Sequence, residues 1–389
     1  MRQLKYVNVE RLCLFMLLFG GYIKMLLPII SFPVYFFQAF SVFSGVIFLL
    51  KNDKISYNAF GLYILLGLFA ICSLFSTFGY SKIIFIFILK MILYLLAIYG
   101  LLNEIGDKKE FDNFINMAIK LQGIVFAIYI VSQFGAIFNM VLNGSRIETA
   151  EQNAIWLSRF CNDLILMIFF YNKGKVSLKK GMEIGILLLF AFFTGSKGPL
   201  LAMLLVGGVT WMLLYQSRYG GKKLLLIGSV LFLAGVTFCV LQNMSGAFIN
   251  SRYSIETMLT NSYGYRLHRY LFSLDLIKNK PLCGYGAGSW GTMYGSNYSD
   301  YPHNILIQIA FEYGLIFTFV FVLFISGMLL KNAKKIKKIG NIQLVFLVLT
   351  FSNFVYSMTS GAIFDGNALL YCYLVILCYF SNKEVEEKV

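Results

Sequence analysis

The sequence predicts an all-α protein, a polytopic membrane helix bundle of about 12 transmembrane helices that forms a single membrane domain over residues 1–389. Hydrophobic residues make up 59% of the chain and charged residues only 13%, whereas soluble domains carry about 25% charged residues. The apolar residues fall into long runs, and the basic residues cluster between these runs. The net charge of +15 therefore indicates membrane loops and not nucleic-acid binding.

Apolar runs of roughly 20 residues define the expected spans, because a helix of this length crosses the hydrocarbon core. The first run follows a basic N-terminal segment without a small-residue cleavage site, so we expect it to be retained as a span. The expected spans cover about residues 10–26, 28–50, 58–77, 81–102, 115–137, 153–171, 182–195, 199–215, 223–241, 303–329, 341–359 and 363–380.

The distribution of lysine and arginine predicts the orientation of these spans. With the N-terminus inside, the inner segments hold 21 of these residues and the outer segments hold 8, which agrees with the enrichment of basic residues in cytoplasmic loops. Both termini are then cytoplasmic, and the longest polar segment, at about 242–302 before the tenth span, faces outward. The outer basic residues are Lys82, Arg146, Lys197, Arg252, Arg266, Arg269, Lys278 and Lys280.

The outer loop 242–302 is predicted to contain a short amphipathic helix. Its apolar residues recur at helical spacing and its polar residues occupy the other faces, so we expect it to lie on the outer face of the membrane. The helix is expected to end at Asn279-Lys280-Pro281. The glycine-rich segment 284–289 follows no predicted strand, so we interpret it as a flexible turn and not as a dinucleotide-binding motif. The apolar positions are Leu267, Tyr270, Leu271, Leu274 and Ile277.

His303 is the sharpest candidate for chemistry. Pro302 suits the first position of a helix, which puts His303 in the first turn of the tenth span. The positive end of the helix dipole disfavours a protonated imidazole, and a neutral imidazole can accept a proton as a general base. The alternative interpretation is an interfacial histidine that caps the helix.

A polar stripe follows on the same predicted helix. Asn304, Gln308 and Glu312 recur at steps of four residues on an otherwise apolar span. An ionisable side chain inside a membrane is costly and usually faces a cavity or a partner, so Glu312 is a second catalytic candidate. The alternative is that the stripe joins neighbouring helices or supports His303.

Four outward-facing cations suggest an anionic ligand. Arg146, Lys197, Arg266 and Arg269 run against the enrichment of basic residues on the inside. Guanidinium groups bind phosphate oxygens in a bidentate way, so a lipid diphosphate is a matched ligand. The run before Lys197 is short, which predicts that its turn is recessed, and Pro199 is expected to open the next helix. The alternative is scattered surface charge.

Two further features point to structural roles or to no role. Arg159 and Asp163 lie four residues apart within the sixth expected span and are interpreted as a pair that neutralises itself. The sequence has no cysteine–histidine constellation typical of zinc and no carboxylate cluster typical of a divalent metal, so we expect no metal and no cofactor.

Taken together, these motifs resemble the O-antigen ligase and O-antigen polymerase superfamily of bacterial envelope glycosyltransferases. The resemblance rests on the predicted span layout, the long outer loop before the tenth span and the outer Arg146 followed by Asn153. Lys197 stands where the family usually has an arginine. The local motifs are Thr194-Gly195-Ser196-Lys197-Gly198, Arg266-x-x-x-Tyr270, Asn279-Lys280-Pro281-Leu282-Cys283-Gly284-Tyr285-Gly286, Tyr301-Pro302-His303-Asn304 and Glu312-Tyr313-Gly314.

This resemblance implies that the protein transfers a glycan from an undecaprenyl-diphosphate carrier to an acceptor hydroxyl, outside the bacterial cytoplasmic membrane. Arg146, Lys197 and Arg266 would hold the diphosphate, and His303 would act as the base. Tyr301, Asn304 and Gln308 would be supporting residues. The implied partners are the lipid-linked glycan, an acceptor glycan, membrane lipids, and chain-length regulator and flippase proteins, with no nucleic acid.

The resemblance does not separate a polymerase, which joins repeat units, from a ligase, which moves finished glycan onto lipid A-core. We favour the polymerase, because the chain lacks the larger outer or C-terminal region of protein-glycosylating members. A polysaccharide or lipid transporter is the alternative from another class. It would use the same cations along a pathway reaching both membrane faces, whereas here the candidate residues gather on the predicted outer side. A simple membrane scaffold does not explain the polar stripe.

Overall fold

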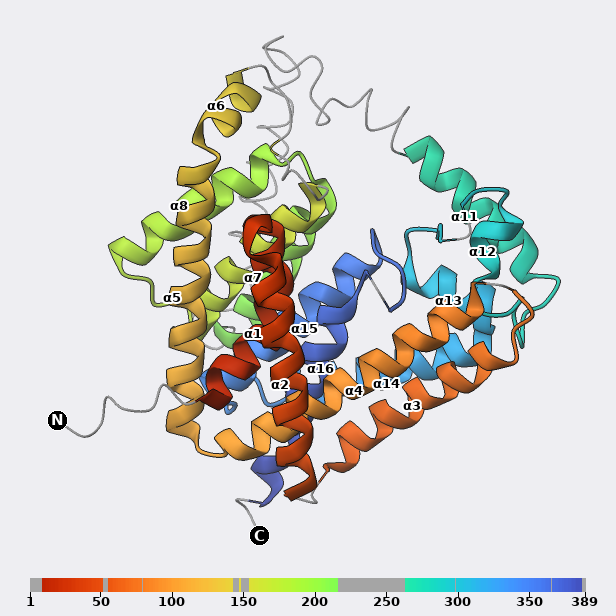
Figure 1. Ribbon diagram of the computed structural model, residues 1–389, viewed down its shortest axis with the longest axis horizontal. Helices are drawn as coiled ribbons and strands as arrows, with labels where there is room; N and C mark the ends of the chain where they lie inside the picture. The colour runs from red at the N-terminus through yellow and green to blue at the C-terminus, as the bar shows by residue number, and fades with distance from the viewer. Residues whose placement is uncertain are drawn as a thin grey trace.

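The structure is a computed structural model that describes residues 9–51, 55–78, 80–142, 147, 154–215, 263–297, 299–364 and 366–386. Over these ranges its regular elements are all helices, as the sequence predicts (Figure 1). The first part of the predicted outer loop, 242–262, lies outside the described residues, and so does the expected span 223–241.

The N-terminal part of the chain folds into long, apolar helices. A 3-10 turn at Pro28, η1, joins the first two of them. The expected boundary at Leu27-Pro28 is therefore confirmed as the end of the first helix. Ser56 caps the third α-helix, because its side chain accepts a hydrogen bond from the backbone N–H of Ala59. The elements are α1 (Val9–Leu26), η1 (Pro28–Ile30), α2 (Ser31–Lys51), α3 (Tyr57–Leu74), α4 (Ser81–Ile105), α5 (Lys108–Ser132) and α6 (Phe134–Leu142).

The C-terminal part alternates long helices with the short helices of the outer loop. An unlabelled helix, Lys197–Tyr215, follows α8. It begins at Lys197, two residues before the expected start at Pro199. The other elements are α7 (Ala154–Tyr171), α8 (Leu178–Phe193), α11 (Tyr263–Ile277), α12 (Ser289–Met293), α13 (Ile305–Tyr313), α14 (Leu315–Ala333), α15 (Asn341–Ser357) and α16 (Ala368–Glu386).

Seven helices in the described part of the chain are long and apolar enough to cross a membrane, and α15 and α16 are apolar but shorter. This supports a multi-pass membrane protein. The tenth expected span, 303–329, is not one helix: it divides at Gly314 into α13 and α14. The seven helices are Pro28–Lys51, Tyr57–Leu74, Ser81–Ile105, Lys108–Ser132, Ala154–Tyr171, Lys197–Tyr215 and Leu315–Ala333.

The core and the outer surface of the bundle are both apolar. α1 packs against α2, α4, α5 and α7, while α15 and α16 pack together and against α7 and α4, respectively. The stretch 370–379 of α16 is buried throughout. By contrast, α2, α3 and α14 expose large side chains such as Phe32, Phe60 and Phe319. Such apolar exterior surfaces are expected where a helix faces lipid, because the tails are as apolar as the side chains.

Predicted inner and predicted outer segments gather at different ends of the bundle. One cavity is lined by residues 106–108, 173 and 338–343, all in or beside predicted inner segments. Another is lined by residues such as Tyr80, Trp156, Asp300 and Ser360, at or near predicted outer segments. The helices α4, α7 and α15 each run from one cavity to the other. The predicted alternation of loops is therefore consistent with the fold, and which end faces the cytoplasm stays a prediction.

The closest helix packing joins α2 to α4. Gly45 and Gly100 face each other, and a methyl group added at Gly100 would overlap the carbonyl oxygen of Gly45. Added at Gly45, it would overlap the carbonyl oxygen of Ala97. Small residues allow membrane helices to approach this closely, and packing is their main source of association energy.

We expect Gly100→Val to lower the amount of folded protein in the membrane, because the new side chain must push α2 away from α4. Overpacking of this kind typically costs about 1–3 kcal/mol. Gly67→Val in α3 is the matched control, since nothing lies within 4 Å of a methyl group there. The measurement is the detergent-solubilised monodisperse fraction. Equal loss in both variants would mean that valine itself, and not the contact, is harmful.

Candidate active site

Gly314 separates the helices α13 and α14. Around it, the backbone of the segment 281–286 forms hydrogen bonds with that of residues 311–315. The segment 281–286 runs along the break, where Leu315 N donates to Pro281 O (2.7 Å), Tyr285 N to Phe311 O (2.8 Å) and Gly286 N to Glu312 O (2.9 Å). Gly314 has a φ of 90°, and a side chain on it would overlap the carbonyl of Leu282. The glycine-rich segment is thus a fixed, hydrogen-bonded strap and not the flexible turn expected.

The polar stripe of α13 faces the loop between α15 and α16, residues 358–367. Asn304 caps α13 by accepting from the backbone N–H groups of Leu306 and Ile307, and it donates to Met358 O at 3.2 Å. Gln308 accepts from Ile363 N (3.2 Å) and donates to Glu312 Oε1 (3.4 Å). The helical spacing therefore predicted the shared face correctly.

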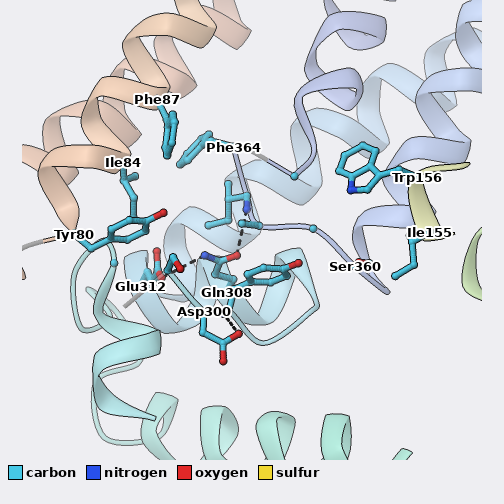
Figure 2. Close-up of a pocket in the computed structure, with 17 residues that line it drawn as sticks. Tyr80, Ile84, Phe87, Ile155, Trp156, Asp300, Gln308, Glu312, Ser360 and Phe364 are labelled. Atoms are coloured by element: carbon cyan, nitrogen blue, oxygen red, sulfur yellow. Dashed lines mark hydrogen bonds between the residues drawn. The ribbon is translucent and has the colours of Figure 1, made fainter. Parts of the chain in front are cut away.

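A cavity of about 310 Å³ lies against this face, and we call it the active-site cavity. Figure 2 shows Gln308 and Glu312 on one wall, the start of α4 on a second and the 358–367 loop on a third. Trp156, at the start of α7, closes another side. The residues that line the cavity include Tyr80, Ile84, Phe87, Trp156, Asp300, Tyr301, Gln308, Glu312, Ser360 and Phe364.

Arg159 of α7 holds the loop 358–367 in place. Its guanidinium donates to three backbone carbonyls, those of Ser360 (2.9 Å), Gly366 (3.2 Å) and Tyr356 (3.3 Å). The side chain is buried and lies against the ring of Trp156, with 4.9 Å between Cζ and the ring centroid. The expectation of a structural role agrees with these contacts.

Arg159 and Asp163 interact electrostatically, as expected, but their hydrogen bonds go to other partners. Asp163 instead accepts hydrogen bonds from Tyr22 Oη (3.0 Å) and Asn353 Nδ2 (3.3 Å). These bonds tie α7 to α1 and α15. Two residues four apart on a helix share a face, but here each side chain has found backbone or polar partners on other helices.

His303 lies one residue before the cap of α13. The helix begins at Ile305 with Asn304 as its N-cap, so the expected position in the first turn was wrong. His303 instead adopts a left-handed backbone, with φ of 62°, which is uncommon for a residue other than glycine. Its ring packs edge-on against Tyr301 at 4.5 Å between centroids. His303 does not line the active-site cavity itself; its neighbour Tyr301 does.

The surroundings of His303 lower its pKa and favour a neutral ring. Burial is the main cause that lowers its pKa to about 4, with further lowering by Arg269 and Arg266 and an opposing effect of Asp300. The expected neutral imidazole is therefore supported, but burial contributes more than the neighbouring cations do. The Nδ1 atom is buried and has no hydrogen-bond partner among the described residues.

Glu312 lies between two cavities. Its side chain is 2% exposed, and it lines both the active-site cavity and a second one of about 450 Å³ beside the strap. Oε1 accepts from Gln308. Oε2 makes no hydrogen bond of good geometry with the described residues, but the backbone N–H groups of Gly288 and Trp290, at the start of α12, also stabilise the carboxylate.

Arg269 is committed to the protein. Its two terminal nitrogens bind both oxygens of Asp300 at 2.7 Å, and Nη1 also donates to Tyr301 O. The side chain is 2% exposed and lies against the rings of Trp290 and Tyr294, which stack on each other. The expected role of Arg269 in binding diphosphate is therefore corrected: its guanidinium holds the 300–301 segment next to His303.

The predicted amphipathic helix of the outer loop is present as α11. Part of its polar side faces the protein: Arg269 and Ser273 are buried, and Ser273 Oγ accepts from Trp290 Nε1 at 2.8 Å. Leu267 and Leu271 of the predicted apolar face are 52% and 53% exposed, whereas Ile277 at its end is buried. The helix is therefore where the periodicity predicts it, and its location on the membrane surface stays a prediction.

Arg266 is the cation that the structure brings to His303. It is half-buried and lowers the pKa of His303. Arg266 forms no hydrogen bond and no ion pair with the described residues. Its guanidinium is thus available for an anionic ligand in the neighbourhood of His303.

The remaining predicted cations lie in or near other segments. Lys197 is half-buried at the start of its helix, as expected for a recessed turn. The adjacent Gly198 packs against Thr359, where a methyl group would approach Thr359 Oγ1 to 2.8 Å, so this turn borders the 358–367 loop. Arg146 lies outside the described residues.

Sequence reasoning missed the 358–367 loop and its contacts. The expected spans left only three residues, 360–362, between two helices, because Ile363 and Phe364 extend the apolar run. The polar and glycine residues around Gly361 and Asn367 could have indicated this loop. Asp300 was also missed. In the described part of the chain, no group of three or more His, Cys, Asp or Glu side chains could hold a metal.

We expect Arg269→Ala to lower the midpoint of thermal unfolding, whereas Arg266→Ala leaves it nearly unchanged. The first change removes charged hydrogen bonds worth about 1.5–3 kcal/mol each and leaves Asp300 without its bidentate partner. The second removes a side chain that has no such bonds among the described residues. Differential scanning fluorimetry of the purified proteins measures both. Equal destabilisation would contradict the separate roles given to the two arginines.

Comparison with known proteins agrees with the motifs. Residues 184–322 match the family model described as O-antigen ligase. No curated protein matches the chain. The matched stretch includes every predicted site residue except Arg146. The match agrees with the resemblance to the O-antigen ligase and O-antigen polymerase superfamily over residues 184–322.

Proposed function

We propose that the protein is a polymerase that joins undecaprenyl-diphosphate-linked oligosaccharide repeat units into O-antigen, capsule or exopolysaccharide. The observation that carries the proposal is the meeting of His303, with an unpartnered Nδ1, and Arg266 beside a cavity whose wall holds Glu312. The family match supports glycan transfer of the ligase or polymerase type. Neither His303 nor Arg266 lines the cavity itself, but Tyr301, whose ring packs on His303, does.

The proposed reaction is a single displacement at the anomeric carbon. A hydroxyl oxygen of the acceptor glycan attacks this carbon, the new glycosidic bond forms, and the bond to the lipid diphosphate breaks. The electron pair leaves with the diphosphate, and the hydroxyl proton passes to Nδ1 of His303. Arg266 stabilises the charge that develops on the diphosphate. Arg146 and Lys197 are proposed as further contacts to it.

Other side chains of the cavity have supporting roles in this proposal. Glu312 Oε2 would accept a hydrogen bond from an acceptor sugar, and it is the second candidate for the base. Gln308 and Asn304 hold α13 against the 358–367 loop, and Tyr301 packs on the His303 ring. Diphosphate is a good leaving group, so a base of modest strength is sufficient and the proposed step uses no metal.

An O-antigen ligase is the second candidate, because the description of the matched family names this activity. The two functions differ in the acceptor. Purified protein supplied only with lipid-linked repeat units forms long chains if it is a polymerase. A ligase forms product only when lipid A-core is added. Chain-length regulator and flippase proteins remain proposed partners.

The proposal places the site on the outer side of the bacterial cytoplasmic membrane, with both termini inside. We expect reporters fused near Asn297 to respond as outside and those near Lys335 as inside, because basic residues are enriched in cytoplasmic loops. The measurement is a paired alkaline phosphatase and fluorescent-protein fusion at each position. An inside response at Asn297 would put the site in the wrong compartment and end the proposal.

We expect His303→Gln to reduce chain extension by about 10²–10⁴-fold, because glutamine keeps hydrogen bonding but cannot act as a base. With its pKa near 4, His303 is neutral across physiological pH. Protonation of the His303 ring should therefore not lower the wild-type rate between about pH 8 and pH 5, and it should lower the rate toward pH 4. The measurement is the initial rate of transfer against pH.

The matched control for backbone strain is His303→Asn, since asparagine tolerates the left-handed conformation that His303 adopts. Both variants should be present in the membrane at normal levels and inactive. Wild-type polymer from His303→Gln would instead assign the base to Glu312, and Glu312→Gln would then be the inactive variant.

A further inference from the structure

We propose that Lys24 and Lys90 form a second phosphate-binding site beside the active-site cavity, and that this site holds the diphosphate of the lipid-linked acceptor. This inference rests on the proposed polymerase function. Such an enzyme must bind two lipid diphosphates at once, one on the glycan that is transferred and one on the glycan that receives it. The cations near His303 account for only the first.

The two lysines line a separate cavity of about 500 Å³ between α1, α2 and α4, which we call the lysine cavity. It adjoins the active-site cavity, because four residues line both: Phe87, Trp156, Phe364 and Gly366. A ligand could therefore extend from one cavity into the other without leaving the protein.

The charges of the lysine cavity are all of one sign. Its lining contains no Asp or Glu, and neither lysine forms a hydrogen bond or an ion pair with the described residues. Lys24 lies over the ring of Tyr35, with Nζ 3.8 Å from the ring centroid. Two cations without a counter-charge in a cavity are suited to bind an anion.

Lys90 is not explained by its place in the membrane. Lys24 is close to the end of α1, and a lysine there can reach the interface. Lys90 is the tenth residue of α4, a candidate membrane span of 25 residues. An ionisable side chain within a span is costly and usually faces a cavity or a partner. Lys90 is exposed and lies at the open side of the lysine cavity.

The rest of the lining suits a lipid. Leu17, Leu18, Met91 and Leu369 supply apolar surface, while Gln38 and Tyr94 supply hydrogen-bonding groups. Gln38 donates to Tyr94 Oη at 3.3 Å, which fixes both side chains. A diphosphate at the lysines could keep its isoprenoid chain against this apolar surface. Free phosphate would leave the apolar surface unused.

Distance from the reacting atoms assigns the site to the acceptor. In the donor, the diphosphate is bonded directly to the reacting carbon, so its cations must lie next to the base, as Arg266 does. In the acceptor, the reacting hydroxyl and the diphosphate are at opposite ends of a repeat unit. On α4, Phe87 is the last residue that lines the active-site cavity, and Lys90 lies three residues beyond it, about 4.5 Å further along the helix axis.

The test is native mass spectrometry of the full chain in detergent with undecaprenyl diphosphate as the probe. We expect two bound equivalents for the wild type and one for Lys24→Gln/Lys90→Gln. The charge-preserving Lys24→Arg/Lys90→Arg should keep two. Lys82→Gln is the matched control, because Lys82 is exposed on the same helix and lines neither cavity. It should also keep two.

A kinetic arm assigns the site to one substrate. With labelled donor and unlabelled acceptor, Lys24→Gln/Lys90→Gln should raise the KM of the acceptor by roughly tenfold or more and leave that of the donor within about twofold. A rise in the KM of the donor alone would overturn the assignment to the acceptor. An equal loss of the second equivalent on adding dioleoylphosphatidylglycerol, but not dioleoylphosphatidylcholine, would instead identify a site for bulk anionic lipid.

The outcomes separate this inference from the proposed function. A wild type that makes polymer but binds one equivalent overturns the lysine site alone. A wild type that binds no undecaprenyl diphosphate overturns the proposed function as well. Two equivalents in the glutamine variant would show that the second site lies elsewhere in the chain.

Discussion

The backbone contact between the strap 281–286 and the end of α13 is the constraint on which the site depends. The three hydrogen bonds around Gly314 replace helical bonds that a continuous span would have made, so the break leaves no large cost in unpaired backbone. The break frees α13 to point its polar side at the 358–367 loop while α14 continues into the apolar region. Without it, Gln308 and Glu312 would belong to a long apolar helix and would need partners among its neighbours.

A second constraint acts from the opposite side of the cavity. Arg159 is a buried cation that is satisfied by carbonyl dipoles and not by an acid. This arrangement fixes an irregular segment within the bundle, where backbone groups without partners would be costly. Gln308 holds the same loop from the α13 side through Ile363 N. The cavity is thus formed between two irregular segments, each fixed by hydrogen bonds, and its shape does not rely on apolar packing alone.

Much of the fold, and part of the site, could be predicted from the sequence. Long apolar runs indicate spans directly, and the spacing of Asn304, Gln308 and Glu312 gave their common face. The break at Gly314 could not be predicted, because hydropathy is continuous across it. The side of α11 that packs on the protein could not be predicted either, since apolar periodicity does not tell lipid from protein as the neighbour. The salt bridge of Arg269 with Asp300 joins residues 31 apart, and no local pattern indicates such a partner.

Gly284 in the strap and Gly314 beyond α13 determine where the chain can tolerate insertions and deletions. Gly284 packs against the backbone of Phe311 and Glu312, and Gly314 against that of Leu282. These two contacts fix the register of one segment on the other. An inserted residue within 281–286 would shift that register and turn Glu312 away from the cavity. The exposed residues 295–297 carry no such restraint, so insertions and deletions between relatives should collect there, while the strap keeps a constant length.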